Sequence, residues 1–225
     1  MKTRLLILCV LVTAGLTLPG TVGCGQGASG NGAEVSLPPP TTVGGMGVAE
    51  AIAKRRSVRE FTNEDLTIEQ ISQLAWAAQG ITEPQRGLRA APSAGALYPL
   101  ELYLFTKDGV FHYVPKGHKL EQVGTRDRRH ELSLAALGQS SVASAALDFV
   151  ITAVFARTEA KYGERSRQYV YMEAGHAAEN IHLQAVALGL ASVPVGALRQ
   201  QAVDGILELS PEETSLYIIP VGHAR

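Results

Sequence analysis

Apolar residues follow two periodicities along the chain, and together they predict interspersed helices and strands. Apolar positions three and four residues apart, typical of one helix face, occur in residues 47–56, 67–78, 129–137, 165–188 and 198–207. Alternating or continuous apolar runs, typical of strands, occur in residues 100–105, 110–114, 149–155, 192–195 and 215–221. Thr67 and Gln70 have the spacing of a capping box, so the second helix is expected to begin at Thr67. This order favours one sheet flanked by helices in residues 46–225.

Residues 1–23 have the pattern of a signal peptide. Lys2 and Arg4 precede an uncharged apolar run, residues 5–18, which is shorter than the roughly 20 residues of a transmembrane helix. The sequence Thr-Val-Gly then precedes Cys24 and resembles the lipobox of bacterial lipoproteins, in which the cysteine is acylated. We therefore expect an exported lipoprotein anchored through Cys24. The alternative is an ordinary secretory signal cleaved near Gly23.

Residues 24–45 are predicted to be a tether between this leader and the folded domain. Residues 25–32 read GQGASGNG, a flexible composition, and residues 38–40 are three prolines, which form a stiff extended spacer. The folded domain is expected to occupy residues 46–225.

Composition and charge exclude several classes of protein. The 225 residues are 46 % hydrophobic and 18 % charged, which excludes wholesale disorder, a collagen-like repeat and a coiled coil. The formal net charge is −1, and loss of the two basic residues of the leader makes it −3, so nucleic-acid binding is not indicated. Two cysteines, one of them inside the leader, and six scattered histidines predict no metal site.

The first segment that can carry chemistry is KRRSVREF, residues 54–61, at the end of the first predicted helix. Arg55, Arg56 and Arg59 offer paired donors that match phosphate oxygens, and Ser57 adds a short donor. These residues predict a phosphate clamp. The alternative is a solvated basic helix end, whose charge offsets the helix dipole.

Two further segments consist of small residues. In APSAGALYP, residues 91–99, Pro92, Ser93 and Ala94 form a backbone that a flat ligand can approach closely, with Ser93 as a donor; the alternative is a plain surface loop. In GLASVPVG, residues 189–196, a helix end turns into a strand. This turn either presents backbone amides to a ligand or is a simple connection.

In this order and at these separations, the three segments, together with the helix KYGERSRQYVYMEAGHAAEN (residues 161–180), resemble the FMN-dependent nitroreductase family. The detailed match is to its SagB-type dehydrogenase branch, whose members oxidise azolines in peptides. The resemblance implies an α+β fold, a three-layer sandwich with a central, mainly antiparallel sheet flanked by helices. It also implies an interlocked homodimer with FMN at the interface, exchanging hydride between flavin N5 and a small organic or peptide-derived substrate.

The resemblance assigns residues to both ends of the cofactor. Arg55, Ser57 and Arg59, with Arg56 nearby, would hold the phosphate and the ribityl chain. Many relatives carry a basic residue beyond the last strand that reaches the phosphate, and in this chain the residue in that place is Arg225.

The flavin ring would lie between the two segments of small residues. Pro92, Ser93 and Ala94 would contact it across the dimer seam. The edge of the ring would lie along a turn whose backbone amides are near N5. This turn consists of Val193, Pro194, Val195 and Gly196. Nitroreductases often have Glu where Val195 stands, which puts the usual pyridine-nucleotide contacts in doubt.

The resemblance also implies a catalytic pair, Lys161 and Tyr162. In the SagB-type branch a Lys-Tyr pair supports proton removal while the flavin takes hydride. A lysine acts as a base only where its surroundings lower its pKa toward neutrality, and a tyrosine can position substrate or relay a proton. The alternative is a solvated Lys161 with Tyr162 packed at the edge of the core.

Export conflicts with the electron donor of ordinary nitroreductases, because NAD(P)H is not expected beyond the inner membrane. Either the enzyme oxidises a substrate and passes electrons onward, or the leader is misread and the enzyme is cytoplasmic. Two other classes of function stay open from the sequence. One is a non-catalytic FMN-binding exported lipoprotein, and the other is an exported binding protein for another phosphorylated ligand.

Overall fold

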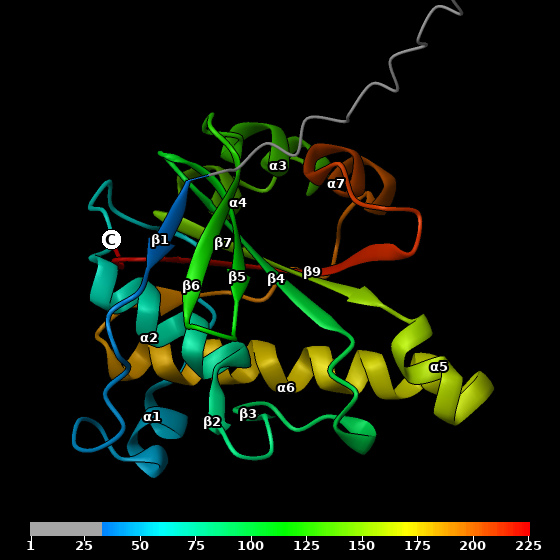
Figure 1. Ribbon diagram of the computed structural model, residues 1–225. Coiled ribbons are helices and arrows are strands. Elements are labelled where there is room, and N and C mark those ends of the chain that lie inside the picture. Colours follow the sequence, from blue (N-terminus) through cyan, green and yellow to red (C-terminus); the bar gives the residue numbers. More distant parts are fainter. Residues whose placement is uncertain (1–32) are drawn as a thin grey trace, which may run out of the picture. The chain divides into compact units, whose positions relative to one another are not determined.

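The computed structural model describes residues 33–225; the predicted signal peptide and Cys24 lie outside them. The described residues form a seven-stranded sheet between two layers of helices (Figure 1). The strands of this sheet are β1 (Glu34–Ser36), β4 (Leu100–Thr106), β5 (Gly109–Val114), β6 (Lys119–Gly124), β7 (Leu147–Val154), β8 (Ala191–Ser192) and β9 (Glu213–Gly222). They lie in the order β1-β6-β5-β4-β7-β9-β8, and each neighbouring pair is antiparallel. The expected α+β sandwich with a mainly antiparallel sheet is confirmed.

The remaining elements surround this sheet. A separate hairpin consists of β2 (Ile81–Glu83) and β3 (Leu88–Arg89). The helices are α1 (Val48–Lys54), α2 (Ile68–Gln79), α3 (Arg129–Ala135), α4 (Ser140–Ser144), α5 (Ala156–Tyr162), α6 (Ser166–Ala187) and α7 (Gln200–Leu207), with 3₁₀ turns η1 (Ala94–Ala96) and η2 (Gly163–Arg165). Within the described part of the chain, every helix is too short or too polar to cross a lipid bilayer.

The central strand β7 supplies both cores, because successive side chains of a strand point to opposite faces of the sheet. Leu147, Phe149 and Ile151 pack on the face covered by α2 and α6. Val150 packs on the other face, with side chains from α3, α4 and α7. Figure 1 shows α6 running along one side of the sheet and α3 and α7 on the opposite side.

The helices α2 and α6 pack directly against each other. Thr67 begins α2 as predicted: its hydroxyl accepts the Gln70 amide at 3.3 Å, and the Gln70 side chain accepts the Thr67 amide at 2.8 Å. The buried face of α6 consists largely of alanines, among them Ala174, Ala177 and Ala178, which let a neighbouring backbone approach closely.

The folded domain begins earlier than the predicted boundary at residue 46. Residues 34–36, in the predicted tether, form β1 and pair with β6. The Leu37 amide donates to the His118 carbonyl at 3.1 Å, and the Thr41 amide donates to the Gln73 side chain at 2.8 Å. Residues 34–37 of the predicted tether therefore belong to the folded domain, because Leu37 is buried and the backbone of β1 completes the edge of the sheet.

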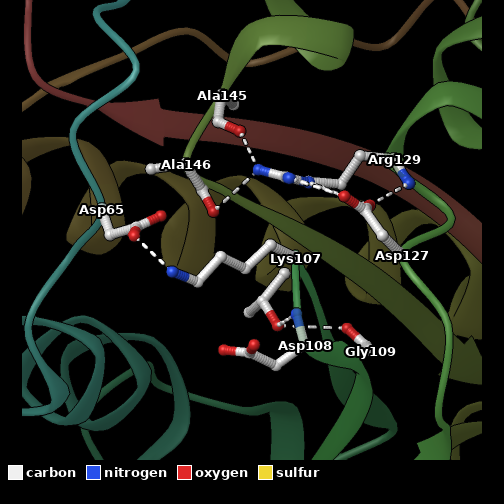
Figure 2. Close-up of polar contacts among 9 residues, drawn as sticks. Asp65, Lys107, Asp108, Gly109, Asp127, Arg129, Ala145 and Ala146 are labelled. Carbon is white, nitrogen blue, oxygen red and sulfur yellow. Dashed lines mark hydrogen bonds and ion pairs between the residues drawn. The ribbon is translucent and has the colours of Figure 1, made fainter.

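A buried carboxyl group lies at the start of β7. Asp148 is fully buried, and neither of its carboxylate oxygens has a hydrogen-bond partner among the residues that the structure describes. The nearby Arg129 instead binds Asp127 at 2.6 Å and donates to the Ala145 carbonyl at 2.8 Å (Figure 2). Burial raises the pKa of Asp148 well above its usual range, although the charge of Arg129 acts in the opposite direction.

Replacing Asp148 by Asn is expected to stabilise the protein at neutral and alkaline pH. Because its pKa is raised in the folded state, Asp148 contributes stability below the unfolded pKa of about 3.9, and this contribution is lost as the pH rises through the folded pKa. Asp148→Asn should therefore increase the free energy of unfolding by about 1–3 kcal/mol at pH 8 and change it little at pH 3.5. Urea unfolding at both pH values measures this. The control Asp127→Asn should give no gain; equal stability of Asp148→Asn and parent at pH 8 contradicts the prediction.

Candidate functional site

The basic segment lies along the edge of the sheet formed by β8. After α1 ends, Ser57 pairs with Ser192 of β8, and the Val58 amide donates to the Ser192 carbonyl at 3.1 Å. Farther along, Phe61 is buried and pairs with Ala224, just beyond β9. Backbone pairing therefore holds the predicted phosphate clamp against a segment some 130 residues later in the sequence.

The arginines of this segment differ in their surroundings. Arg55 is about one-third exposed, and its Nη1 lies 3.1 Å from Nε2 of His182 in α6. The guanidinium of Arg56 instead donates to the carbonyls of Ala53 and Arg55 at 3.1 and 2.6 Å. Arg56 therefore binds carbonyls at the end of α1, and Arg59 is exposed.

The C-terminal residue lies next to the basic segment. The Arg225 amide donates to the Glu60 carbonyl at 3.1 Å, and the Arg225 side chain is exposed. The backbone of Arg225 is thereby held against that of Glu60, the residue that follows Arg59 in the basic segment.

The turn after β8 offers fewer free amides than predicted. The amides of Val193 and Val195 donate to carbonyls of β9 at 3.2 and 2.7 Å, and Pro194 has no N–H group. Gly196 is exposed, and its amide has no acceptor among the described residues. The amides of Val193 and Val195 are therefore used within the sheet, and only the Gly196 amide of this turn stays without a partner among the described residues.

The loop of residues 91–99 is held by its own Ser93 and by a buried glutamate. The Ser93 hydroxyl oxygen accepts the Tyr98 amide at 2.9 Å. The Ala94 amide donates to Glu173 at 2.9 Å. Ser93 and Glu173 therefore both fix the backbone of this loop.

The predicted Lys-Tyr pair lies directly on this loop. Gly95 has φ = 63°, a left-handed conformation that glycine adopts readily. A Cβ atom at Gly95 would lie 2.9 Å from Lys161 Nζ and 3.0 Å from the Tyr162 hydroxyl. Lys161 is exposed, and the half-buried ring of Tyr162 meets that of Tyr169 edge to face at 5.1 Å. The structure therefore joins the pair and the loop, which are more than 60 residues apart in sequence.

Glu173 is a site residue that the sequence reading missed. It is only 4 % exposed and lies in α6 next to the buried Val170 and Ala174. Burial raises the pKa of Glu173, and the bonds from the Ala94 amide and the Ser93 hydroxyl oppose that rise. A carboxylate on the apolar face of a predicted helix was the available signal.

The two groups of candidate residues lie at different positions along α6. His182 contacts the basic segment, and Glu173 contacts the loop. Nine residues of helix separate them by about 13.5 Å along the axis, at 1.5 Å per residue. Figure 1 shows α1 near one end of α6 and α5 at the other. The two groups of candidate residues are therefore separate within one chain, and residues 33–225 contain no cluster of three or more potential metal ligands.

Removing the Glu173 carboxylate is expected to loosen the loop. Glu173→Ala leaves the Ala94 amide without its acceptor and should lower the free energy of unfolding by about 1–3 kcal/mol. Glu173→Gln keeps an acceptor oxygen and should stay within about 0.5 kcal/mol of the parent. Urea unfolding compares the three proteins at pH 7. An alanine variant as stable as the parent would show that this contact does not hold the loop.

Comparison with known proteins gives consistent matches. Residues 52–223 match the sequence model of the nitroreductase family. A Methanocaldococcus jannaschii protein assigned as a nitroreductase is 39 % identical over 199 residues, which cover 86 % of this chain and 98 % of that protein. The trifolitoxin-processing protein TfxB of Rhizobium leguminosarum is 28 % identical over 134 residues, covering 55 % of this chain and 36 % of TfxB. A Ralstonia eutropha crystal structure, also assigned as a nitroreductase, superposes with a TM-score of 0.79 at 30 % identity, covering 88 % of this chain and 92 % of that one.

Proposed function

The chain belongs to the nitroreductase family, and on this premise we propose that it is a dimeric, FMN-dependent oxidoreductase acting on a small organic or peptide-derived substrate. The observation that carries the proposal is the pair of half-sites on α6. One is the basic segment around Arg55, and the other is the loop around Gly95 with Lys161 and Tyr162 against it. When bound, FMN supplies a centre that exchanges two electrons as hydride at N5.

The donors of the first half-site fit the phosphate end of FMN. Arg55 is partly exposed, Ser57 and Arg59 are exposed, and the backbone of Arg225 is bonded to that of Glu60 in the same segment. Guanidinium groups bind phosphate oxygens in pairs, so this set would hold a dianionic phosphate. The free Gly196 amide would serve the flavin edge.

The second half-site fits the flat ring. Pro92, Ser93, Ala94 and Gly95 carry small or compact side chains, so a planar ligand can lie close to the backbone. As the resemblance to the nitroreductase family implies, we infer that one cofactor uses the basic segment of one copy and the loop of another.

Exposed apolar side chains support such a dimer. Ile52 in α1 and Tyr171 and Met172 in α6 are 57 %, 49 % and 50 % exposed. They flank the two half-sites, and a second copy packed there would remove their apolar surface from water. Each interface would then contain two complete cofactor sites.

Lys161 and Tyr162 would take part in the proton transfer of the reaction. Oxidation of a C–H bond by hydride transfer leaves a proton to be removed from the substrate. The Lys161 amine, in its neutral form, would accept that proton while the Tyr162 hydroxyl positions the reacting group. Similarity to a trifolitoxin-processing protein supports this SagB-type reaction over general nitro-group reduction.

The catalytic role of the pair predicts kinetic losses without loss of flavin. The purified protein should contain FMN, and an anaerobic screen of substrates and acceptors should find compounds that reduce or reoxidise it. Lys161→Ala should slow substrate-dependent flavin reduction about 100-fold, and Tyr162→Phe should slow it less. The control Lys107→Ala, which removes an exposed lysine paired with Asp65, should behave as the parent.

Each alternative has its own outcome in this experiment. If Lys161→Ala and Tyr162→Phe both match the parent for every substrate found, the pair is not catalytic although the flavin function stands. A flavin that stays reduced with every acceptor points to the non-catalytic FMN-binding protein. A protein without FMN after reconstitution contradicts the proposal itself.

We also propose that the enzyme is exported and anchored through a lipid on Cys24, with electrons passing to a partner other than NAD(P)H. The basic residues, apolar run and small residues before Cys24 support this. A tagged full-length chain should then fractionate with membranes, and Cys24→Ala should release it from them. Recovery of both proteins in the cytoplasmic fraction contradicts export.

A further inference from the structure

A buried histidine connects the basic segment to the sheet. His182 lies in α6 and is 2 % exposed. One ring nitrogen, Nδ1, is hydrogen-bonded to the hydroxyl of the buried Ser192. The other, Nε2, lies 3.1 Å from Nη1 of Arg55. Neither His182 nor Ser192 is among the residues that we assign to direct contact with FMN.

The partners of His182 determine where its proton lies. A guanidinium is only a donor, so Nε2 must be an unprotonated acceptor for Arg55. The neutral ring then carries its hydrogen on Nδ1 and donates it to the Ser192 hydroxyl oxygen. Burial, and to a lesser degree the charge of Arg55, lowers the pKa of His182 to about 4, which keeps the ring neutral at pH 7.

This bond restricts a long and flexible side chain. Nε of Arg55 lies 4.0 Å from Glu179, and the side chain keeps about one-third of its surface exposed. With Nη1 fixed on His182, the remaining N–H groups of Arg55 are available on the exposed side. An arginine fixed in this way loses less conformational entropy when it binds a phosphate.

Ser192 links the same histidine to the backbone of the basic segment. Its carbonyl accepts the Val58 amide at 3.1 Å, and its hydroxyl accepts from His182. Ser192 therefore fixes the position of the backbone of the basic segment and, through His182, the orientation of the Arg55 side chain.

We propose that His182 is a positioning residue that holds Arg55 in the orientation that binds the phosphate of FMN. The inference rests on the proposed FMN-dependent function. It assigns His182 no contact with the reacting atoms, so its effect should fall on binding of the phosphate and disappear when Arg55 is absent.

The test compares two ligands that differ by the phosphate. Dissociation constants of FMN and of riboflavin, which has the same ring system without the phosphate, are measured by flavin fluorescence on the full-length protein freed of flavin. His182→Asn loses the acceptor for Arg55 and should weaken FMN binding about tenfold. His182→Gln can keep an acceptor oxygen near the position of Nε2 and should weaken it less than about threefold. Riboflavin should bind both variants as it binds the parent.

Two further measurements separate positioning from a general structural role. In an Arg55→Ala background, His182→Asn should cause no additional loss of FMN affinity, because the residue acts through Arg55. Nitrogen-15 NMR of the unmodified protein at pH 7 should show His182 neutral with its hydrogen on Nδ1, a result that needs no variant to fold.

Several results would overturn the inference. They are unchanged FMN affinity in His182→Asn, an equal loss for FMN and riboflavin, a full additional loss in the Arg55→Ala background, or a ring with hydrogen on Nε2. In each of these the parent still binds FMN, so the proposed function stands. A parent that binds no FMN overturns the function and this inference together.

Discussion

The packing of α6 against the sheet sets the geometry of the candidate site. Its alanine-rich face lies on strands β4, β7 and β9, and α2 packs beside it. Because side chains on this face are small and well packed, α6 is held rigidly and cannot slide without opening the core. His182 and Glu173 both lie on the helix, and each contacts one half-site. The rigid helix therefore keeps the basic segment and the small-residue loop at a constant separation.

Most of the architecture could be predicted from the sequence because periodicity reports burial directly. The run 149–155 corresponds to the buried strand β7, and the capping pattern at Thr67 marks the start of α2. The strand β6 was not predicted because it carries charged and polar side chains at a half-exposed position of the sheet. The strand β1 was hidden among prolines and glycines, since its pairing with β6 depends on a partner some 85 residues away.

The candidate site was predicted less completely, for a similar reason. The residue types in the basic segment and in the loop of small residues are visible locally, and the structure brings Lys161 and Tyr162 onto Gly95. Which hydrogen-bond donors are available to a ligand depends on hydrogen bonds between residues that are far apart in the sequence. The amides of Val193 and Val195 are used by β9, and the Ser93 hydroxyl is used within its loop. No local pattern reports these bonds, nor that two polar residues of α6 are buried beneath the site.

The pairing of β1 with β6 would have a mechanical consequence under the anchoring through Cys24 that we propose. In the strand order, β1 is at one margin of the sheet and β8, which supports the basic segment, is at the other. Six inter-strand spacings of about 4.8 Å put roughly 29 Å between them. Tension on the chain between Cys24 and Glu34 would be borne first by three residue pairs of β1 and could separate that strand while the opposite margin stays intact. Loss of β1 would expose the unpaired backbone N–H and C=O groups of β6. The protein would then become prone to aggregation while the cofactor pocket is still intact.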